Sequence, residues 1–235
     1  MLDQVLITYT IRISTRAKRL HIKINRLAQV EVVSPPKVTK AEIDSFVQSN
    51  ILWIERHTNR ILADHKQDET SSIDPPGEIY FPLLEQTYHV RYLPDSEHNK
   101  FTIKDSVVNV FFDCDEEKRN QLQKFIQRIA KLELPEMLDK ISDDVNLPYN
   151  RVFIKAQKTR WGSCSSKKNI NLNRNLLFLK PEQVEYLMVH ELCHTVHLNH
   201  SPRYWKFVSS FIPGYKEIDK SLRKATSKVP LWALV

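Results

Sequence analysis

The feature that most constrains this chain lies between His190 and His200, where four histidines fall within eleven residues. His190 and His194 are four residues apart, and on an α-helix this spacing places both imidazoles on one face, about one turn apart. Two imidazoles placed in this way can bind one zinc ion, while Glu191 is directed towards a water on the metal. We therefore expect a helix that presents two metal ligands and a general base.

A zinc ion that catalyses hydrolysis usually has three protein ligands and an open position. His200 is the candidate third ligand, but on an unbroken helix it would lie about 240° around the axis from His194. The chain is expected to turn back at Asn199, a residue type that tolerates the left-handed conformation, and to begin a new element at Ser201-Pro202. We interpret His197 as a surface histidine or a support for the ligands, with the helix continuing through it.

The alternative interpretation is a buried helix whose histidines bind no metal. A motif as short as this one also arises by chance. An apolar run before the motif does predict a core helix, and it consists of Val184, Leu187, Met188 and Val189. A core helix that also carries a glutamate between the histidines, with a third histidine at a suitable distance, favours a metal site.

Composition and length limit the class of protein. The 235 residues suffice for one large domain or two small ones, and 41% are hydrophobic while 27% are charged. Three widely spaced cysteines argue against a disulfide framework and for a reducing compartment, which predicts a cytoplasmic location. We expect no signal peptide and no membrane association, because no segment approaches the roughly 20 apolar residues of a membrane span.

The first third of the chain predicts two strands followed by a helix. Two segments alternate in hydrophobicity and are rich in β-branched residues, as strands are: 4–14 and 18–33. Thr39 and Glu42 have the spacing of a capping box, which predicts a helix that runs to about His65. The polar residues 66–77 are typical of a connecting loop.

The rest of the chain predicts alternating strands and helices. Further strands are expected at Glu78–Leu93, Phe101–Phe112, 151–160 and Asn169–Leu179. Helices are expected over 116–142, from Pro181 through the histidine motif, and over 202–212 and 214–226. Pro135 should kink or split the first of these helices, and Trp161–Cys164 should form a tight polar turn. The apolar tail Val229–Val235 is expected to pack on the body of the protein or on a partner.

Four segments carry a resemblance to a known family. They are Arg160-Trp-Gly-Ser-Cys-Ser, Ile170-Asn-Leu-Asn, His190-Glu-Leu-Cys-His and Asn199-His-Ser-Pro-Arg-Tyr-Trp205. Together they resemble the YgjP-like metallopeptidase family, a relative of the SprT-like and WLM zinc peptidases, and the N-terminal strands and the helix with Trp53-Ile54 extend the similarity over most of the chain. The resemblance implies a zincin fold in which His190, His194 and His200 bind Zn²⁺ and Glu191 is the catalytic residue.

The expected fold is therefore α+β: a compact zincin-like metallopeptidase with a small mixed sheet packed on the active-site helix, preceded by an N-terminal strand-strand-helix part. The N-terminal part is expected over residues 1–70 and the zincin-like region over 71–235. One continuous domain over 1–235 is the alternative.

The function that follows is zinc-dependent hydrolysis of peptide bonds in a protein or peptide substrate, with Glu191 activating the zinc-bound water. A tetrahedral oxyanion needs a further stabiliser. Tyr204, Arg203 and Arg160 lie near the motifs, but we interpret them as packing or charged-surface residues. Cys164 either faces the site or is a buried structural cysteine, and we favour the second interpretation.

Charge suggests a second class of function. The net charge is +7, and eight basic residues with no acidic one run from Arg151 to Lys180: Arg151, Lys155, Lys158, Arg160, Lys167, Lys168, Arg174 and Lys180. Such a run can attract nucleic acid, but we favour the interpretation that it is a solvated, lysine-rich surface. The alternative function is thus a nucleic-acid- or protein-binding module with a structural or vestigial zinc site. An intact Glu191 favours the enzyme. The sequence does not determine the oligomeric state.

Overall fold

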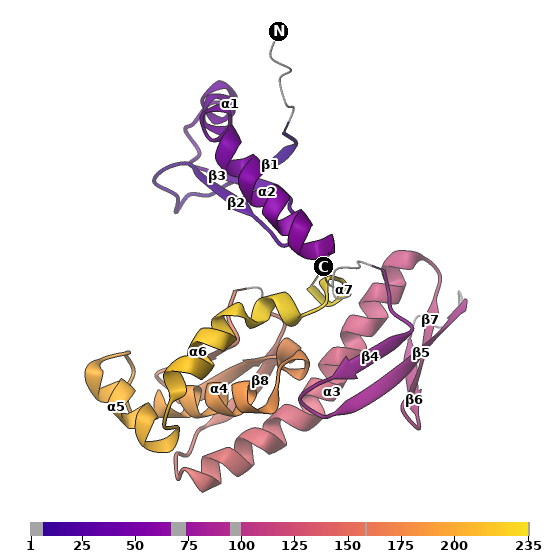
Figure 1. Ribbon diagram of the computed structural model, residues 1–235, viewed down its shortest axis with the longest axis vertical. Helices are drawn as coiled ribbons and strands as arrows, with labels where there is room; N and C mark the ends of the chain where they lie inside the picture. Colours follow the sequence, from indigo (N-terminus) through magenta and orange to yellow (C-terminus); the bar gives the residue numbers. More distant parts are fainter. Residues whose placement is uncertain (1–6, 67–73, 95–99, 158, 235) are drawn as a thin grey trace. The chain divides into compact units, whose positions relative to one another are not determined.

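The computed structural model of the chain describes residues 7–66, 74–94, 100–157 and 159–234. The chain forms two compact units, Met1–Ser71 and Ser72–Val235, and each has a hydrophobic core of its own. Figure 1 shows the three small sheets and the helices that pack on them. The α+β class expected from the sequence is confirmed.

The N-terminal unit contains a three-stranded sheet in the order β1-β3-β2, made of β1 (Tyr9–Ile13), β2 (His21–Ile24) and β3 (Val30–Ser34). The strand β1 is parallel to β3, whereas β2 is antiparallel to it. The predicted single strand 18–33 is wrong, because the chain turns back between β2 and β3. In this turn the Asn25 side-chain oxygen accepts the N–H groups of Leu27 and Gln29, and Ala28 has a φ of 58°. Residues 4–6 of the first predicted strand lie outside the described residues.

Two helices pack on this sheet, α1 (Lys40–Ser49) and α2 (Ile51–Lys66). The predicted capping box is present, since the Thr39 side chain accepts the N–H of Glu42 and the Glu42 carboxylate accepts the N–H of Thr39 at 2.7 Å. The predicted continuous helix is interrupted at Asn50, whose φ of −112° and ψ of 11° leave the helical range. The core between helices and sheet consists of Val30, Val32, Ile43, Val47 and Ile54. The predicted loop 66–77 lies largely outside the described residues.

The larger unit begins with a four-stranded sheet in the order β4-β5-β7-β6, made of β4 (Glu78–Phe81), β5 (Gln86–Pro94), β6 (Phe101–Lys104) and β7 (Val107–Phe112). Each of the two long strands predicted here is two strands, since the chain turns back within it. The turns contain Glu85, Asp105 and Ser106, which all have positive φ. Because none of these residues is glycine, the most common marker of such a conformation is missing from the sequence.

Helix α3 (Asp115–Asp144) runs for 30 residues without interruption through Pro135. Of the two expected effects of this proline, a kink or a split, the split is therefore wrong. Proline removes one backbone donor from a helix, but Leu134 and Leu138 on either side of it are fully buried and hold the helix by packing. Although α3 is long, neither it nor any other helix in the described part of the chain is apolar enough over sufficient length to cross a membrane.

A third sheet follows in the order β8-β10-β9, made of β8 (Arg151–Lys155), β9 (Gly162–Cys164) and β10 (Asn169–Asn173). The central strand β10 is parallel to β8 and antiparallel to β9, so this is the small mixed sheet that was expected. The strands predicted at 151–160 and Asn169–Leu179 were both too long. The second ends at Asn173, whose side chain caps a 3₁₀ helix, η2 (Arg174–Phe178). The Trp161–Cys164 segment was predicted to be a turn, but most of it forms the edge strand β9.

The C-terminal part is helical and consists of α4 (Pro181–Cys193), α5 (Pro202–Phe211), α6 (Tyr215–Lys224), the 3₁₀ helix η3 (Ala225–Lys228) and α7 (Leu231–Leu234). Pro181 lies in the first turn of α4, as predicted. The apolar tail packs on this unit, since Val229, Leu231 and Trp232 are buried.

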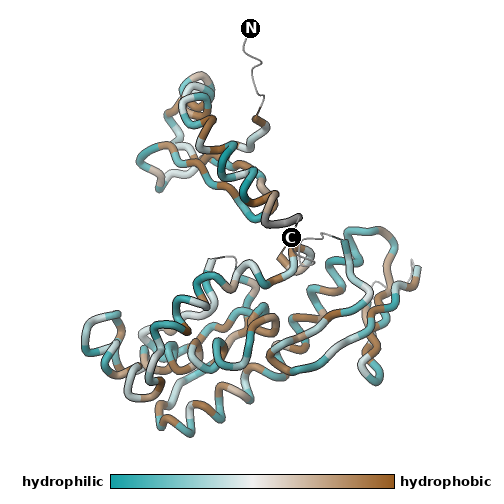
Figure 2. The backbone as a smooth tube through the Cα atoms, in the orientation of Figure 1, coloured by the Kyte–Doolittle hydropathy of each residue, from teal (hydrophilic) through white to brown (hydrophobic). Residues whose placement is uncertain are grey.

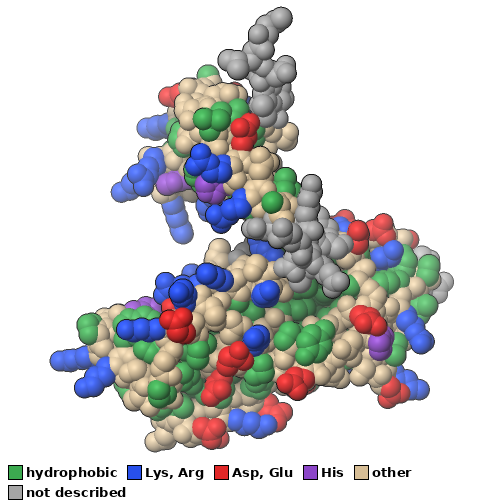
Figure 3. Space-filling view, in the orientation of Figure 1, with side chains coloured by type: hydrophobic (Ala, Val, Ile, Leu, Met, Phe, Trp, Pro, Cys, Tyr) green, Lys and Arg blue, Asp and Glu red, His purple; other side chains and the backbone are tan. Residues whose placement is uncertain are grey.

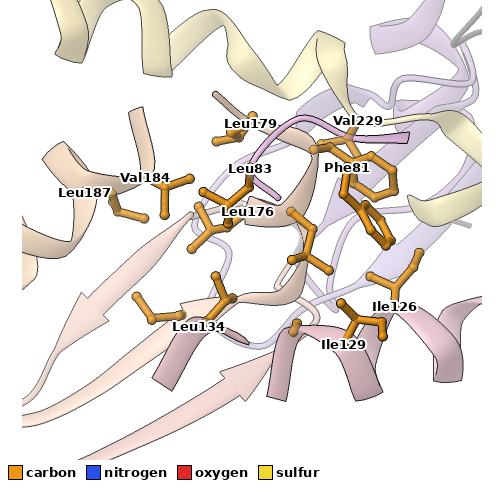
Figure 4. Close-up of a cluster of buried hydrophobic side chains, with 14 of the residues drawn as sticks. Phe81, Leu83, Ile126, Ile129, Leu134, Leu176, Leu179, Val184, Leu187 and Val229 are labelled. Atoms are coloured by element: carbon orange, nitrogen blue, oxygen red, sulfur yellow. The ribbon is translucent and has the colours of Figure 1, made fainter. Parts of the chain in front are cut away.

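The core of the larger unit fixes the position of α4. Figure 4 shows side chains from α3, from η2 and its flank, and from α4 meeting in one cluster, among them Leu134, Leu176, Val184 and Leu187. Figure 2 shows hydrophobic and hydrophilic residues alternating along the helices, as expected for helices with one buried side. The histidine motif therefore lies at the end of a helix that is packed into the core along its length.

Candidate metal centre

Helix α4 carries His190 and Glu191, and its buried side consists of Val184, Leu187, Met188, Val189 and Leu192. His194 follows as the C-cap residue, immediately after the last helical residue, Cys193. The prediction that the helix continues through His197 is therefore wrong. The N–H groups of Val196 and His197 both bond to the carbonyl of Cys193, which closes a tight turn directly after the motif.

His200 returns to the helix, as its spacing required. Its Nε2 lies 3.1 Å from Nε2 of His190 and 3.1 Å from Nε2 of His194. Asn199 does not have the predicted left-handed conformation. The return is supported instead by Ser201, the N-cap of α5, whose side chain accepts the N–H of Tyr204 at 3.4 Å.

The three histidine nitrogens fit a tetrahedral cation. Zinc–nitrogen bonds of about 2.0–2.1 Å at tetrahedral angles place ligand nitrogens about 3.3–3.4 Å apart. The two measured separations of 3.1 Å are close to this value, and all three ligand atoms lie within 4.8 Å of one another. Within the described ranges, no other group of His, Cys, Asp or Glu converges in this way. His194 is buried whereas His200 is exposed, so the group is accessible from the side of His200.

Contacts around His194 fix the orientation of its ring. Its Nδ1 donates to the carbonyl of His197 at 2.9 Å, which leaves Nε2 unprotonated and available to a metal. Tyr204 stacks on the same ring, with centroids 4.5 Å apart and planes 19° apart. The Tyr204 side chain is fully buried, and its hydroxyl donates to the His190 carbonyl at 3.0 Å. Tyr204 therefore packs the site, in agreement with its interpretation from the sequence.

A chain of polar contacts leads from helix α6 to His190. The Nδ1 of His190 faces the Tyr186 hydroxyl at 3.5 Å, and that hydroxyl donates to Asp219 at 3.0 Å. Asp219 is paired with Arg223 at 2.7 Å. Because the hydroxyl hydrogen is directed to Asp219, the Tyr186 oxygen is free to accept Nδ1–H, and Nε2 of His190 then points into the site.

Aromatic stacking holds His200, the most exposed of the three. Trp205 of α5 stacks on it, with centroids 5.3 Å apart and planes 23° apart. Trp205 stacks in turn on Tyr215 of α6, at 5.3 Å and 4°. Two helices that follow the motif thus position the third histidine.

Burial keeps the imidazoles of His190 and His194 neutral. Burial and the neighbouring His194 and His200 lower the pKa of His190 to about 3. Burial also lowers the pKa of His194, although the hydrogen bond to the His197 carbonyl opposes this effect. Neutral imidazoles retain the lone pairs that a metal ion requires.

Glu191 is only 4% exposed. Burial raises its pKa to about 8, against the lowering effects of the Arg160 charge and of a hydrogen bond from the backbone N–H of Cys164. Its Oε2 has no hydrogen-bond partner among the residues that the structure describes. Buried polar atoms are nearly always paired in proteins, so a lone carboxylate oxygen beside a cluster of histidines indicates a functional group.

The edge strand β9 explains how Glu191 is accommodated. Gly162 lies directly against the carboxylate, and a Cβ at this position would be 2.6 Å from Oε1 and 2.9 Å from Cγ of Glu191. Only glycine allows this approach. From the sequence, the Trp161–Cys164 segment had no assigned role. The chain contains only three glycines, so the glycine in this segment was a usable signal of a close contact.

The structure also clarifies the remaining candidates. Burial, and after it the charge of Glu191, raises the pKa of Cys164 to about 11, so this half-buried thiol stays protonated. Tyr186 and Asp219 were missed by sequence reasoning. Tyr186 precedes His190 by one helical turn, which was a usable signal. Asp219 comes from a different helix and has no local signal.

Comparisons with known proteins place the chain among the metallopeptidases. The family model for the YgjP-like metallopeptidase domain matches residues 18–225. The chain therefore belongs to the YgjP-like family, and the resemblance of its motifs is confirmed. Among curated proteins, none matches the chain.

Two solved structures of metallopeptidase zymogens are similar to part of the chain. Abylysin from Pyrococcus abyssi is 28% identical, with a TM-score of 0.35, and the match covers 39% of this chain and 94% of abylysin. Jannalysin from Methanocaldococcus jannaschii is 20% identical, with a TM-score of 0.36, and the match covers 40% of this chain and 97% of jannalysin.

Gly162→Ala should displace the Glu191 carboxylate, because the added methyl group overlaps Oε1 and Cγ. Overpacking of this kind typically costs about 1–3 kcal/mol of stability. A crystal structure of the variant will show the carboxylate position, and equilibrium unfolding will give the change in stability. Gly77→Ala is the matched control, since a Cβ there meets nothing within 4 Å. An unmoved carboxylate in Gly162→Ala would contradict this account of β9.

Proposed function

We propose that this chain is a zinc-dependent peptidase in which His190, His194 and His200 bind the ion and Glu191 is the general base. The observation that carries the proposal is the convergence of three imidazole nitrogens next to a buried carboxylate with one unpaired oxygen. Membership of a metallopeptidase family supports it. We also propose a reducing compartment such as the cytoplasm, because all three cysteines are free thiols.

Zinc bound by three imidazoles would supply Lewis acidity, which acidifies a water molecule and polarises the carbonyl of a peptide bond. The chain's own contribution is proton transfer and positioning. Glu191 accepts the proton of the attacking water through its free oxygen and returns it to the leaving amine.

An extended polypeptide is the substrate class that we propose. The strand β9 lies at the edge of its sheet, so one side of it has no strand partner in the described part of the chain. Extended peptides add to such edges through main-chain hydrogen bonds. Because Gly162 of β9 contacts Glu191, a peptide aligned on this edge would pass close to the base and the three histidines.

The alternative function is a binding module with a structural zinc site. A structural site does not need a general base, and it is usually closed by four protein ligands. The group here has three histidines and is exposed at His200. A buried carboxylate with a free oxygen has no purpose in a structural site, so we favour the enzyme.

Purified chain should contain close to one zinc ion per molecule, and His200→Ala should remove most of it. His197→Ala should retain zinc, because His197 orients His194 through its backbone carbonyl and not through its ring. Metal analysis and competition with a chelator will measure both variants. If His197→Ala loses zinc and His200→Ala keeps it, the assigned third ligand is wrong.

Asp219→Asn and Tyr186→Phe should each weaken zinc binding by about 10- to 100-fold, the usual effect of removing a partner that orients a ligand. Both changes interrupt the contacts that direct Nε2 of His190 into the site. Zinc dissociation constants will be measured by chelator competition. Glu217→Gln is the control, because it removes one negative charge from an exposed position of the same helix. Equal affinities for Asp219→Asn and Glu217→Gln would show that the charge of α6, and not the contact, matters.

Glu191→Gln should retain zinc and the fold while losing hydrolysis. Glutamine keeps the shape of the side chain but does not accept a proton, and general-base catalysis is typically worth about 10²–10⁴ in rate. Cleavage of an unfolded protein will be measured with wild-type and variant preparations of equal zinc content. A zinc-loaded Glu191→Gln variant that cleaves as fast as the wild type would exclude this mechanism.

A further inference from the structure

The N-terminal unit presents a surface that its own fold does not use. On helix α2, the residues Trp53, Arg56, His57 and Arg60 lie within about 100° of one another around the axis. The buried Ile54 lies outside this arc, about 60° further around the axis from His57, and joins the core of the unit. We call these four residues the α2 surface.

An aromatic pair lies at the centre of the α2 surface. The ring centroids of Trp53 and His57 are 4.1 Å apart and their planes are 31° apart. The Nδ1 of His57 is 2.8 Å from the carbonyl of Trp53, which fixes the histidine ring. Trp53 is nevertheless 43% exposed and takes no part in the hydrophobic core. A large, orientated ring that remains in solvent is a ready partner for another flat ring.

Cations surround this pair without opposing acids. From Trp53 to Arg60 the only acidic residue is Glu55, which lies outside the α2 surface. Helix α2 packs beside β2, and the loop before β2 carries three exposed basic residues: Arg16, Lys18 and Arg19. Lys23 of β2 is also exposed, but it lies on the sheet face away from the core, opposite Glu31. Figure 3 shows Lys, Arg and His side chains gathered over β2 and the neighbouring part of α2.

Three acidic residues in the described part of the unit have partners away from the α2 surface. Glu31 is paired with Arg12, Asp44 with Lys40, and Glu42 closes the capping box of α1. Among the described residues, none of the four basic residues of β2 and its loop, nor Arg56 and Arg60, forms an ion pair. Within the described residues, no ion pair neutralises the charges of Arg56 and Arg60.

The acid-free run from Arg151 to Lys180 is less suited to an anion. Arg174 is buried and donates to the carbonyl and the side chain of Gln123 in α3. Its guanidinium group is therefore engaged within the fold and is not available to an external anion. Beside Arg151 and Phe153, a shallow hollow is lined by the carboxylates Asp139 and Asp143. Repulsion from these acids weakens phosphate binding there.

We propose that the α2 surface binds single-stranded nucleic acid. Bases stack on the exposed face of Trp53, and the guanidinium groups of Arg56 and Arg60 contact phosphates on either side. Sequence-tolerant binding of single strands combines these two elements, an aromatic platform and a cationic track along the backbone. An acidic peptide satisfies the cations but offers no rings to stack. An anionic membrane needs a continuous apolar face, whereas this arc of α2 alternates aromatic and cationic residues.

Full-length protein will be titrated into fluorescein-labelled oligo(dT) and oligo(U) of roughly 12–16 nucleotides, within the known range of site sizes, and followed by anisotropy. Binding should weaken as salt rises, because each phosphate contact releases counterions, with a slope of about −0.7 per contact for single strands. The two oligonucleotides distinguish DNA from RNA. A duplex of the same length should bind more weakly, since its bases are not free to stack.

Trp53→Ala should weaken binding by about 10- to 100-fold, the range found for loss of one base-stacking side chain. Trp53→Phe should restore part of the affinity, which separates loss of stacking from loss of fold. The double variant Arg56→Gln, Arg60→Gln should reduce the salt slope by about 1.4, which is two phosphate contacts at about 0.7 each. Circular dichroism will confirm that each variant remains folded.

Two controls match these variants. Leu52→Ala removes a neighbouring apolar side chain that is 73% exposed and should leave binding unchanged. The double variant Arg151→Gln, Lys155→Gln removes two charges from the acid-free run and should also leave binding unchanged.

Four results would overturn the proposal: no binding at low salt, wild-type affinity in Trp53→Ala, equal affinity for duplex, or loss of binding in Arg151→Gln, Lys155→Gln alone. Equal competition by polyglutamate or by anionic phosphatidylserine vesicles would also exclude base stacking. None of these measurements depends on zinc or on Glu191, so the outcome is independent of the proposed peptidase activity.

Discussion

Helix α4 is surrounded by packed elements, and the arrangement of the histidines depends on that burial. Met188, Leu192 and Cys193 are completely inaccessible to solvent. The helix contacts α3, α5, α6 and β9, so it has no freedom to slide or rotate. Because interiors are close-packed, a displacement of this helix would disturb all four neighbours. The positions of His190 and Glu191 are therefore determined by a core to which their own side chains contribute little.

The same burial has an unfavourable side, which the surrounding structure must offset. A carboxylate removed from water without a full set of hydrogen bonds is destabilising, and here it has the backbone N–H of Cys164 and one unpaired oxygen. The neighbouring imidazoles are kept neutral by the same dry environment. Such local conflicts are typical of functional sites, where stability is given up for reactivity. The large core around α3 and α4 stabilises the fold and offsets the cost of burying this carboxylate.

Features that depend on contacts within one helical turn were predicted correctly from the sequence, whereas features that depend on packing between distant segments were not. The capping box at Thr39 and the proline at the start of α4 follow from contacts within one helical turn, and both were predicted correctly. The predicted strands were too long because three turns use non-glycine residues with positive φ, at Ala28, at Glu85 and at Asp105-Ser106. Pro135 likewise remains inside α3, because buried leucines on both sides outweigh the local preference of proline.

The donor set that we propose follows from residue spacing alone: two histidines one helical turn apart, a glutamate between them, and a third histidine that required a reversal of the chain. Their spacing encodes this, since helical geometry relates residue numbers to positions in space. Only the tertiary structure decided which residues support that set. Gly162 makes room for Glu191, and Asp219 reaches His190 through Tyr186, although these residues come from other elements. No periodicity connects such residues, because their proximity arises from how sheets and helices pack.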